Sequence, residues 1–191
     1  MISPAEFEIA VRGLLRLARF DAAFAGFFDL SREGARRSFR LALPLLPISL
    51  WLFNFNTTWP EGSDTVRIGA AEVIGYVLGW TLLPLVLLWC GRAFNLRPRV
   101  FGAIAVYNWL SVLSVAIQIP ISVAVRLGLD PTTGTVLGEG GMIFITACEF
   151  FAFKRLLGIA FEAALALAVT DFFLTLLVLR EVVLPLALGK F

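Results

Sequence analysis

The sequence contains no histidine, and cysteine occurs only twice among its 191 residues, at Cys90 and Cys148. Histidine is the commonest acid–base and metal-binding side chain near neutral pH, so its absence excludes most catalytic and metal-dependent chemistry. The two cysteines lie in separate apolar stretches, where a free thiol usually packs as a small hydrophobic side chain. Phosphate-binding glycine loops and nucleophile motifs are also missing. We therefore expect no enzyme activity, no catalytic residue, no cofactor and no metal.

Charge is also scarce. Only 16% of the residues are charged, whereas 59% are hydrophobic and the mean hydropathy is +0.88. Soluble domains contain about 45–50% apolar residues, so this composition indicates a chain that lies in a bilayer. The net charge of +2 is too small to indicate a nucleic-acid partner. The first residues, MISPAEFEIA, lack a basic region followed by an apolar core, and we expect no cleavable signal peptide.

The apolar runs predict an all-α fold, a polytopic transmembrane helix bundle of about five spans after an amphipathic N-terminal helix. Short polar breaks separate the spans, which we place at residues 39–55, 68–90, 100–125, 136–156 and 159–180. Residues 1–38 would form a cytoplasmic arm and residues 39–191 the membrane domain. Asp130-Pro131 and five glycines between residues 126 and 141 favour a loop there, with the fourth span beginning near Thr135 or Met142. A turn near Gly158 separates the last two spans; one continuous helix there is the alternative, with four spans.

The arm should begin with a helix. Ser3, Pro4 and Glu6 have the pattern of an N-cap, a first helical residue and a capping-box acid. Apolar residues then recur every three or four positions, with basic residues elsewhere on the helix surface. Such a helix either lies on the membrane surface or packs on its own bundle, and the pattern does not choose between the two. Asp29 or Ser31 would cap the helix that follows.

Basic residues predict the orientation. Twelve of the sixteen Lys and Arg residues fall on one side of a five-span bundle, in the arm, in the break at residues 92–99 and at Lys154-Arg155. The other four are Arg67, Arg126, Arg180 and Lys190. The positive-inside rule then places the N-terminus in the cytoplasm and the C-terminus outside. The arm's basic residues are candidates for contact with anionic lipid or a partner: Arg12, Arg16, Arg19, Arg32, Arg36, Arg37 and Arg40.

Asp171 lies near the middle of the fifth predicted span, where a charge is costly. We expect it to be neutral and hydrogen-bonded, with Asn108, Gln118 or Thr170 as partner. It either holds helices together or carries a proton or cation, and a transport role gains if Glu149 faces the same cavity. The candidate intramembrane polar site is Asp171, Glu149, Asn108 and Gln118.

Other polar residues of the spans have simpler expected roles. Glu149 could instead pair with Lys154 or Arg155, although the spacing is poor for that. Glu72 and Glu162 lie nearer span ends, where water is within reach. On the third span, Asn108, Ser111, Ser114 and Gln118 recur every three or four residues and predict one polar stripe.

A cytoplasmic arm, five spans and an external C-terminus resemble the YIP family of small polytopic membrane proteins, which in eukaryotes associate with Rab GTPases. Residues 24–40, FAGFFDLSREGARRSFR, look like the segment before the first span in bacterial integral membrane proteins grouped with that family. The resemblance implies an all-helical membrane fold and transfers no active site to this chain. The GTPase partner is not carried over by analogy.

Two hypotheses of function follow from the sequence. The first is a non-enzymatic scaffold, assembly factor or accessory subunit of a membrane complex in the bacterial inner membrane. Its partners would be anionic lipid headgroups and either another membrane protein or a second copy of the chain, with no nucleic acid. The alternative is a small transporter or proton- or ion-translocating protein that uses an intramembrane carboxylate.

Overall fold

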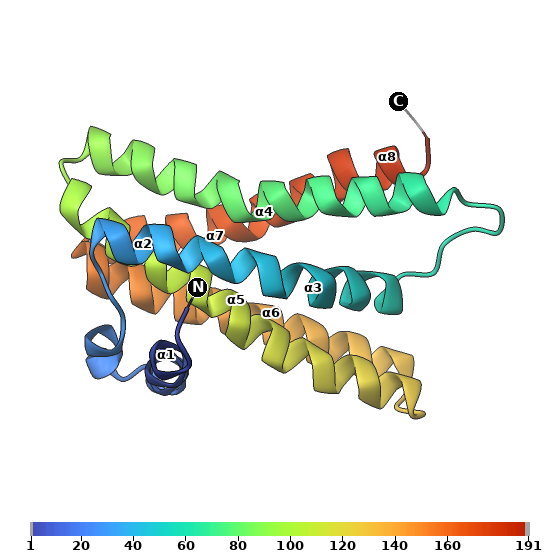
Figure 1. Ribbon diagram of the computed structural model, residues 1–191, viewed down its shortest axis with the longest axis horizontal. Helices are drawn as coiled ribbons and strands as arrows, with labels where there is room; N and C mark the ends of the chain where they lie inside the picture. The colour runs from blue at the N-terminus through green and yellow to red at the C-terminus, as the bar shows by residue number, and fades with distance from the viewer. Residues whose placement is uncertain (1, 190–191) are drawn as a thin grey trace.

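The computed structural model describes residues 2–189 (Figure 1). Its regular structure there is entirely helical, which confirms the expected all-α class. Lys190, one of the basic residues used to orient the chain, lies outside the described residues. The elements in chain order are α1 (Pro4–Leu17), the 3-10 helix η1 (Ala22–Phe27), α2 (Arg32–Ser38), the 3-10 turn η2 (Phe39–Leu41), α3 (Ala42–Asn56), α4 (Thr65–Ala93), α5 (Arg97–Arg126), α6 (Pro131–Leu157), α7 (Phe161–Leu177), the π-helical turn η3 (Val178–Val183) and α8 (Leu184–Ala187).

Five continuous helical stretches are long and apolar enough to cross a membrane: Arg32–Asn56, Thr65–Ala93, Arg97–Arg126, Pro131–Leu157 and Phe161–Ala187. Helices suit this environment because every backbone polar group is bonded within its own segment. The predicted number of spans is confirmed. The first helix begins at Arg32 rather than near residue 39, because the Ser31 hydroxyl accepts a hydrogen bond from the Gly34 amide at 3.1 Å and caps α2.

The turn at Gly158 separates the fourth and fifth spans, as predicted. Gly158 has a left-handed conformation with φ of 65°, and its amide bonds back to the Lys154 carbonyl, so α6 ends there. Arg99 of α5 donates from Nη1 to the Leu157 carbonyl at 3.0 Å, which satisfies one of the free carbonyls at this helix end. The alternative of a single helix through Lys154 and Arg155, with four spans, is excluded.

The loop predicted after Asp130 was wrong, because the helix already begins at Pro131, before both of the predicted starts, Thr135 and Met142. The Asp130 carboxylate accepts from the Thr133 amide at 2.9 Å and caps α6. Two glycines in this stretch face a neighbouring helix: a Cβ at Gly134 would overlap Val125, and one at Gly141 would lie 2.9 Å from Ile117. These glycines let α5 and α6 approach closely, a common use of small residues between membrane helices.

The fifth span also extends beyond its predicted end at residue 180. The chain continues through η3 into α8 and stays helical to Ala187. Arg180 and Glu181 pair with each other on the exposed side, with Nε and Oε1 3.3 Å apart, so both charges remain outside the packed interior. A charged pair therefore does not end this helix.

Helix α5 is the central element of the bundle. Half of its most apolar stretch is buried within the protein, against 11–22% for the other four spans. It contacts α2, α3, α4 and α6, and the arm also reaches it. Figure 1 shows the long helices running side by side, with α1 seen end-on because it crosses them.

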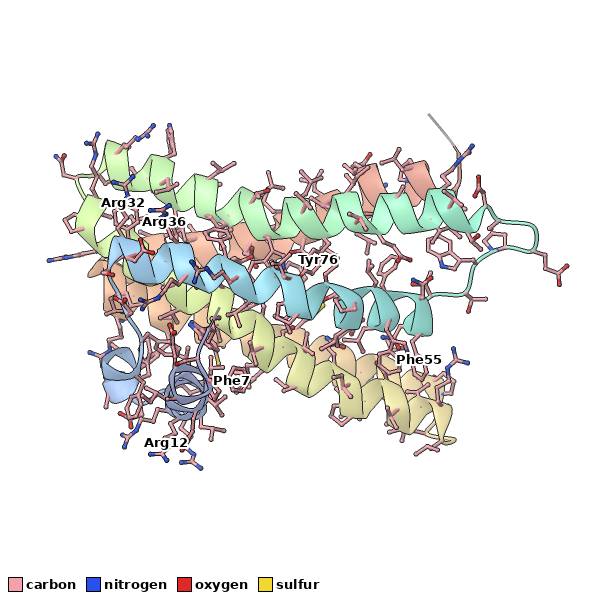
Figure 2. The ribbon with its side chains drawn as sticks, viewed as in Figure 1. Phe7, Arg12, Arg32, Arg36, Phe55 and Tyr76 are labelled. Atoms are coloured by element: carbon pink, nitrogen blue, oxygen red, sulfur yellow. The ribbon has the colours of Figure 1, made fainter. Side chains whose placement is uncertain are left out.

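The N-terminal arm packs on its own bundle. Leu14 and Leu17 of α1 and Phe24 of η1 are buried, and Phe24 is fully enclosed. The Phe7 ring lies against Trp109 of α5, with ring centroids 5.8 Å apart. Of the two placements left open by the sequence, the structure shows the docked one. Figure 2 shows Arg12 on the side of α1 that points away from the bundle.

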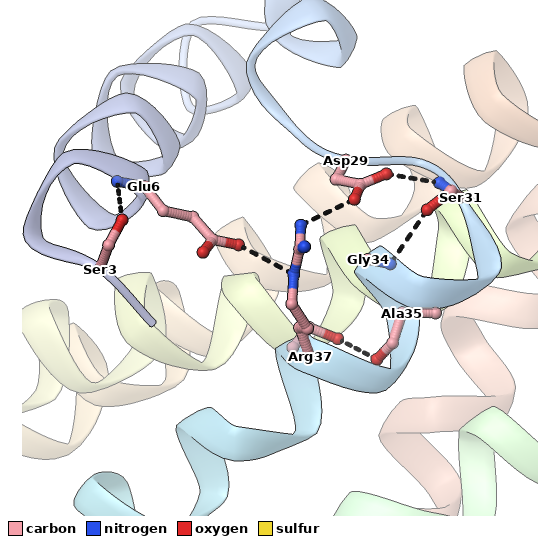
Figure 3. Close-up of polar contacts among 8 residues, drawn as sticks. Ser3, Glu6, Asp29, Ser31, Gly34, Ala35 and Arg37 are labelled. Atoms are coloured by element: carbon pink, nitrogen blue, oxygen red, sulfur yellow. Dashed lines mark hydrogen bonds and ion pairs between the residues drawn. The ribbon is translucent and has the colours of Figure 1, made fainter. Parts of the chain in front are cut away.

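A polar seam joins the arm to α2 (Figure 3). The Ser3 hydroxyl accepts from the Glu6 amide at 3.1 Å, so the predicted N-cap is confirmed. The Glu6 carboxylate faces Arg37 at 3.6 Å, and Arg37 donates from Nη2 to Asp29 at 2.7 Å. Hydrogen bonds from Ser31, and then the Arg37 charge, hold the pKa of Asp29 below its usual value.

Candidate functional site: paired carboxyl groups in the bundle

Three inward-facing side chains from three helices meet inside the bundle. Tyr107 of α5 donates a hydrogen bond from its hydroxyl to Asp171 Oδ1 of α7 at 2.9 Å. Glu149 of α6 is 4% exposed, and its carboxyl group lies within interaction distance of the Asp171 carboxyl. Glu149 Oε2 is buried with no hydrogen-bond partner among the described residues. The site is thus two neighbouring carboxyl groups, one of which accepts a hydrogen bond from a tyrosine, and we name it the carboxyl pair (Glu149 and Asp171).

The carboxyl pair lines a cavity of about 230 Å³ between α5, α6 and α7, which we name the inner cavity. The condition that favours a transport role, Glu149 and Asp171 facing one cavity, is therefore met. The inner cavity is polar for a membrane interior, and it has no Lys or Arg among its lining residues. Its other polar lining residues are Tyr107, Ser111, Ser114, Gln118, Thr146 and Thr175.

Asp171 stands between the inner cavity and a second one. The lateral cavity, about 280 Å³, lies between α3, α4 and the α7–η3 stretch and is lined by both Asp171 and Glu72. A smaller cavity of about 200 Å³ between α4, α5 and α7 shares Gly79 with the lateral cavity and Tyr107 with the inner one. Thr175 lines all three. Asp171 therefore borders two of three neighbouring cavities, and Glu149 borders one of them.

The partner predicted for Asp171 was wrong, because its bond comes from Tyr107. Asn108 points elsewhere: it is fully buried and donates from Nδ2 to the Ser38 hydroxyl at 2.9 Å. Gln118 lines the inner cavity with Asp171 but is not bonded to it, and Thr170 bonds to the Ala166 carbonyl of its own helix.

The polar stripe on α5 begins one residue earlier than predicted. Tyr107, Ser111, Ser114 and Gln118 follow each other at steps of four, three and four, which keeps them on one helix face. Asn108 is turned about 100° away from Tyr107 at 3.6 residues per turn, and so it faces α2. The spacing of Tyr107 from Ser111, Ser114 and Gln118 could have shown from the sequence that the tyrosine lies on the polar face of this helix.

Two glutamates also differ from expectation. Glu149 makes no ion pair with Lys154 or Arg155 among the described residues, because its position on α6 turns it toward α7. Glu72, expected to lie within reach of water, is 6% exposed. Its Oε2 accepts from Asn54 Nδ2 at 2.7 Å, while Oε1 is buried without a partner. The sequence did not indicate the burial of Glu72, because its hydrogen-bond partner Asn54 lies on another span.

The basic residues of the arm form a separate surface. Most have a local partner: Arg12 pairs with Glu8, Arg16 with Asp21 and Arg36 with Glu33, all on the exposed surface. Arg32 lies over the Phe101 ring, 5.9 Å from its centroid. Arg37 is the half-buried member of the seam. Arg19 and Arg40 are exposed and make no ion pair within residues 2–189. Figure 2 shows Arg32 and Arg36 on α2.

The fold and the site together define a class. Five apolar membrane-spanning helices around a buried polar centre make this chain a multi-pass integral membrane protein. Comparison with protein-family models, with curated proteins and with solved structures found no match.

Proposed function

We propose that the protein translocates protons across the membrane and that the carboxyl pair is its proton-binding site. The observation that carries the proposal is that Glu149 and Asp171 face each other across one cavity without a lysine or arginine. Two carboxylates so close repel each other, and no nearby cation offsets that repulsion, so the pair favours holding a proton. Intramembrane acids of this kind commonly mark ion pathways.

The surroundings of the pair suit proton exchange. The inner cavity extends toward Gln118 and Met142 and supplies hydroxyl and amide groups that can bond to water along the way. Tyr107 donates to Asp171 and so stabilises its charged form, while Glu149 Oε2 is free to accept a proton. Asp171 can thus release a proton, and Glu149 can receive it.

Proton flux into vesicles tests the proposal. The protein is reconstituted into liposomes that contain a pH-sensitive dye, and a potassium gradient with valinomycin sets the membrane potential. We expect acidification inside the vesicles well above that of protein-free liposomes. The double variant Glu149→Gln/Asp171→Asn, reconstituted at equal density, should match protein-free liposomes. A wild-type flux equal to that of protein-free liposomes would refute the proposal.

A scaffold or accessory-subunit function is the second candidate. In its favour is the exposed basic surface of the arm, where Arg12 and Arg16 pair with neighbouring acids and Arg19, just after α1, makes no ion pair within residues 2–189 and can meet anionic lipid or an acidic partner. Against it, the bundle already covers part of the apolar surface of α1, since Leu14 and Leu17 are buried, and of its large apolar residues only Phe7, Ile9 and Leu15 remain exposed for a partner. A scaffold would account for the bond between Tyr107 and Asp171 as a link between helices, but it gives no role to the unpartnered oxygen of Glu149 beside them.

The direction of transport requires an orientation, and we propose a cytoplasmic N-terminus and an external C-terminus on the basis of the basic residues. A periplasmic phosphatase reporter tests this in a bacterial inner membrane. A fusion after Phe191 should be active and a fusion after Arg97 inactive. The reverse pattern would contradict the orientation.

A further inference from the structure

A second buried carboxyl group is left unused by the carboxyl pair. Glu72 of α4 lines the lateral cavity, is 6% exposed, and has one oxygen bonded to Asn54 at 2.7 Å. Its other oxygen, Oε1, is buried without a partner among the described residues. An unpartnered carboxyl oxygen in an apolar interior is costly, so its presence at a cavity indicates a ligand that supplies the missing partner.

The residues that line the lateral cavity indicate the chemical character of that ligand. They are mainly aliphatic and aromatic, from residues such as Leu50, Phe53, Leu174 and Val178, and no Lys or Arg lines them. Its titratable lining groups are Glu72 and Tyr76 of α4 and Asp171 of α7, and Asp171 is in turn contacted by Tyr107 and Glu149. The complement of such a surface is an apolar body with a positive charge.

Gly79 lines this cavity without a side chain that would fill it. A Cβ at Gly79 would meet nothing within 4 Å, so the missing side chain leaves open space beside the tyrosines of α4 and α5. The volume of about 280 Å³ lies near the lower end of the range for small-molecule pockets, roughly 300–1,000 Å³. Tyr76 and Phe53 add aromatic faces that attract cations.

We propose that the lateral cavity binds small apolar organic cations, with Glu72 as their counter-ion. When the cation enters, the O–H bond of the Glu72 carboxyl group breaks, its electron pair stays on the oxygen, and the proton leaves to water. Because Asp171 lines the same cavity, binding is coupled to the protonation of the carboxyl pair. This inference deepens the proposed function and rests on it for the coupling, by naming a class of ligand whose binding is linked to the protonation of the carboxyl pair.

Calorimetric titration of the purified protein in lipid nanodiscs tests the inference, with benzyltrimethylammonium as ligand and its uncharged carbon analogue, neopentylbenzene, as comparison. We expect the cation to bind and to release protons to a weakly buffered solution. Glu72→Gln keeps the shape of the side chain and can still accept the bond from Asn54. It should weaken cation binding at least tenfold without changing the binding of the neutral analogue. Gly79→Leu should weaken both ligands by filling the space, whereas Gly69→Leu, on the same helix but outside the lateral cavity, should weaken neither.

Two results would overturn the inference. Equal affinity of the cation for wild type and Glu72→Gln would show that the ligand merely partitions into an apolar groove, as a lipid acyl chain does. Absence of cation binding to the wild-type protein would also contradict the inference. Neither result bears on the proton flux of the reconstituted protein, which is measured without organic cation, so failure of the inference and failure of the proposed function are separate outcomes.

Discussion

Asp171→Asn is expected to reduce proton flux in reconstituted vesicles to the level of protein-free liposomes. Asparagine has nearly the same shape and can still accept the bond from Tyr107, which the aspartate accepts at 2.9 Å. However, its amide group cannot bind and release a proton near neutral pH. Proton transfer through the carboxyl pair is therefore lost, while the packing of the helices is kept. Glu149→Gln should have the same effect, because both carboxyl groups line the inner cavity.

The matched control for this prediction is Glu162→Gln. Glu162 lies in the first turn of α7, on the same helix as Asp171, but it is exposed. Its replacement removes the same chemical group outside the inner cavity, and flux should stay at the wild-type rate. Tyr107→Phe, which removes only the bonding hydroxyl group, should slow the flux without abolishing it. Wild-type flux in Asp171→Asn would show that protons do not pass through the carboxyl pair.

Phe24→Ala is expected to destabilise the docked arm by about 3–5 kcal/mol, the range measured for buried aromatic residues. Phe24 is fully buried, and its ring packs against Phe28 and Phe151 with centroids 6.4 and 5.9 Å apart. Alanine would leave a cavity between η1 and α6, in the core that holds the arm on the bundle. A loss of this size is comparable to the stability of many whole domains.

Spin labels measure this loss directly. One label is attached at position 12 on α1 and a second at position 154 near the end of α6, after both cysteines are replaced. We expect a narrow distribution of distances in the parent protein and a broad one in Phe24→Ala, as the arm leaves the bundle. Phe94→Ala, at an exposed position after α4, serves as control and should keep the narrow distribution. A narrow distribution in Phe24→Ala would show that the arm is held by other contacts.

The fold could be predicted well because its main determinants are local. Apolar length defines a span, and the αL turn at Gly158 needs only one glycine after a basic pair. The predictions of helix ends were wrong where the same short sequence pattern is typical of two different structures. Asp130-Pro131 is typical both of a loop and of a helix start, and glycines such as Gly134 and Gly141 break soluble helices but pack membrane helices.

The site was predictable only in part. Asp171 and Glu149 stand out in the sequence because a carboxyl group in an apolar run has no local explanation. Their meeting depends on the rotation of α6 and α7 about their axes, which the packing of α6 on α5 and of α7 on α6 and α4 determines. Tyr107 was missed because tyrosine is ordinary in a membrane helix, and Glu72 because its partner Asn54 lies on a different span.

The docked arm sets an order of assembly. Phe20 and Phe24 pack on Phe151 of α6, which follows them in the chain by more than a hundred residues. At about 5–20 residues per second, a ribosome reaches Phe151 roughly 6–25 s after it has made Phe24. During that time the arm's apolar face has no bundle to cover it and must be held by lipid or a chaperone. Docking of the arm is therefore a late event in biogenesis, and it reports that the fourth span has been inserted.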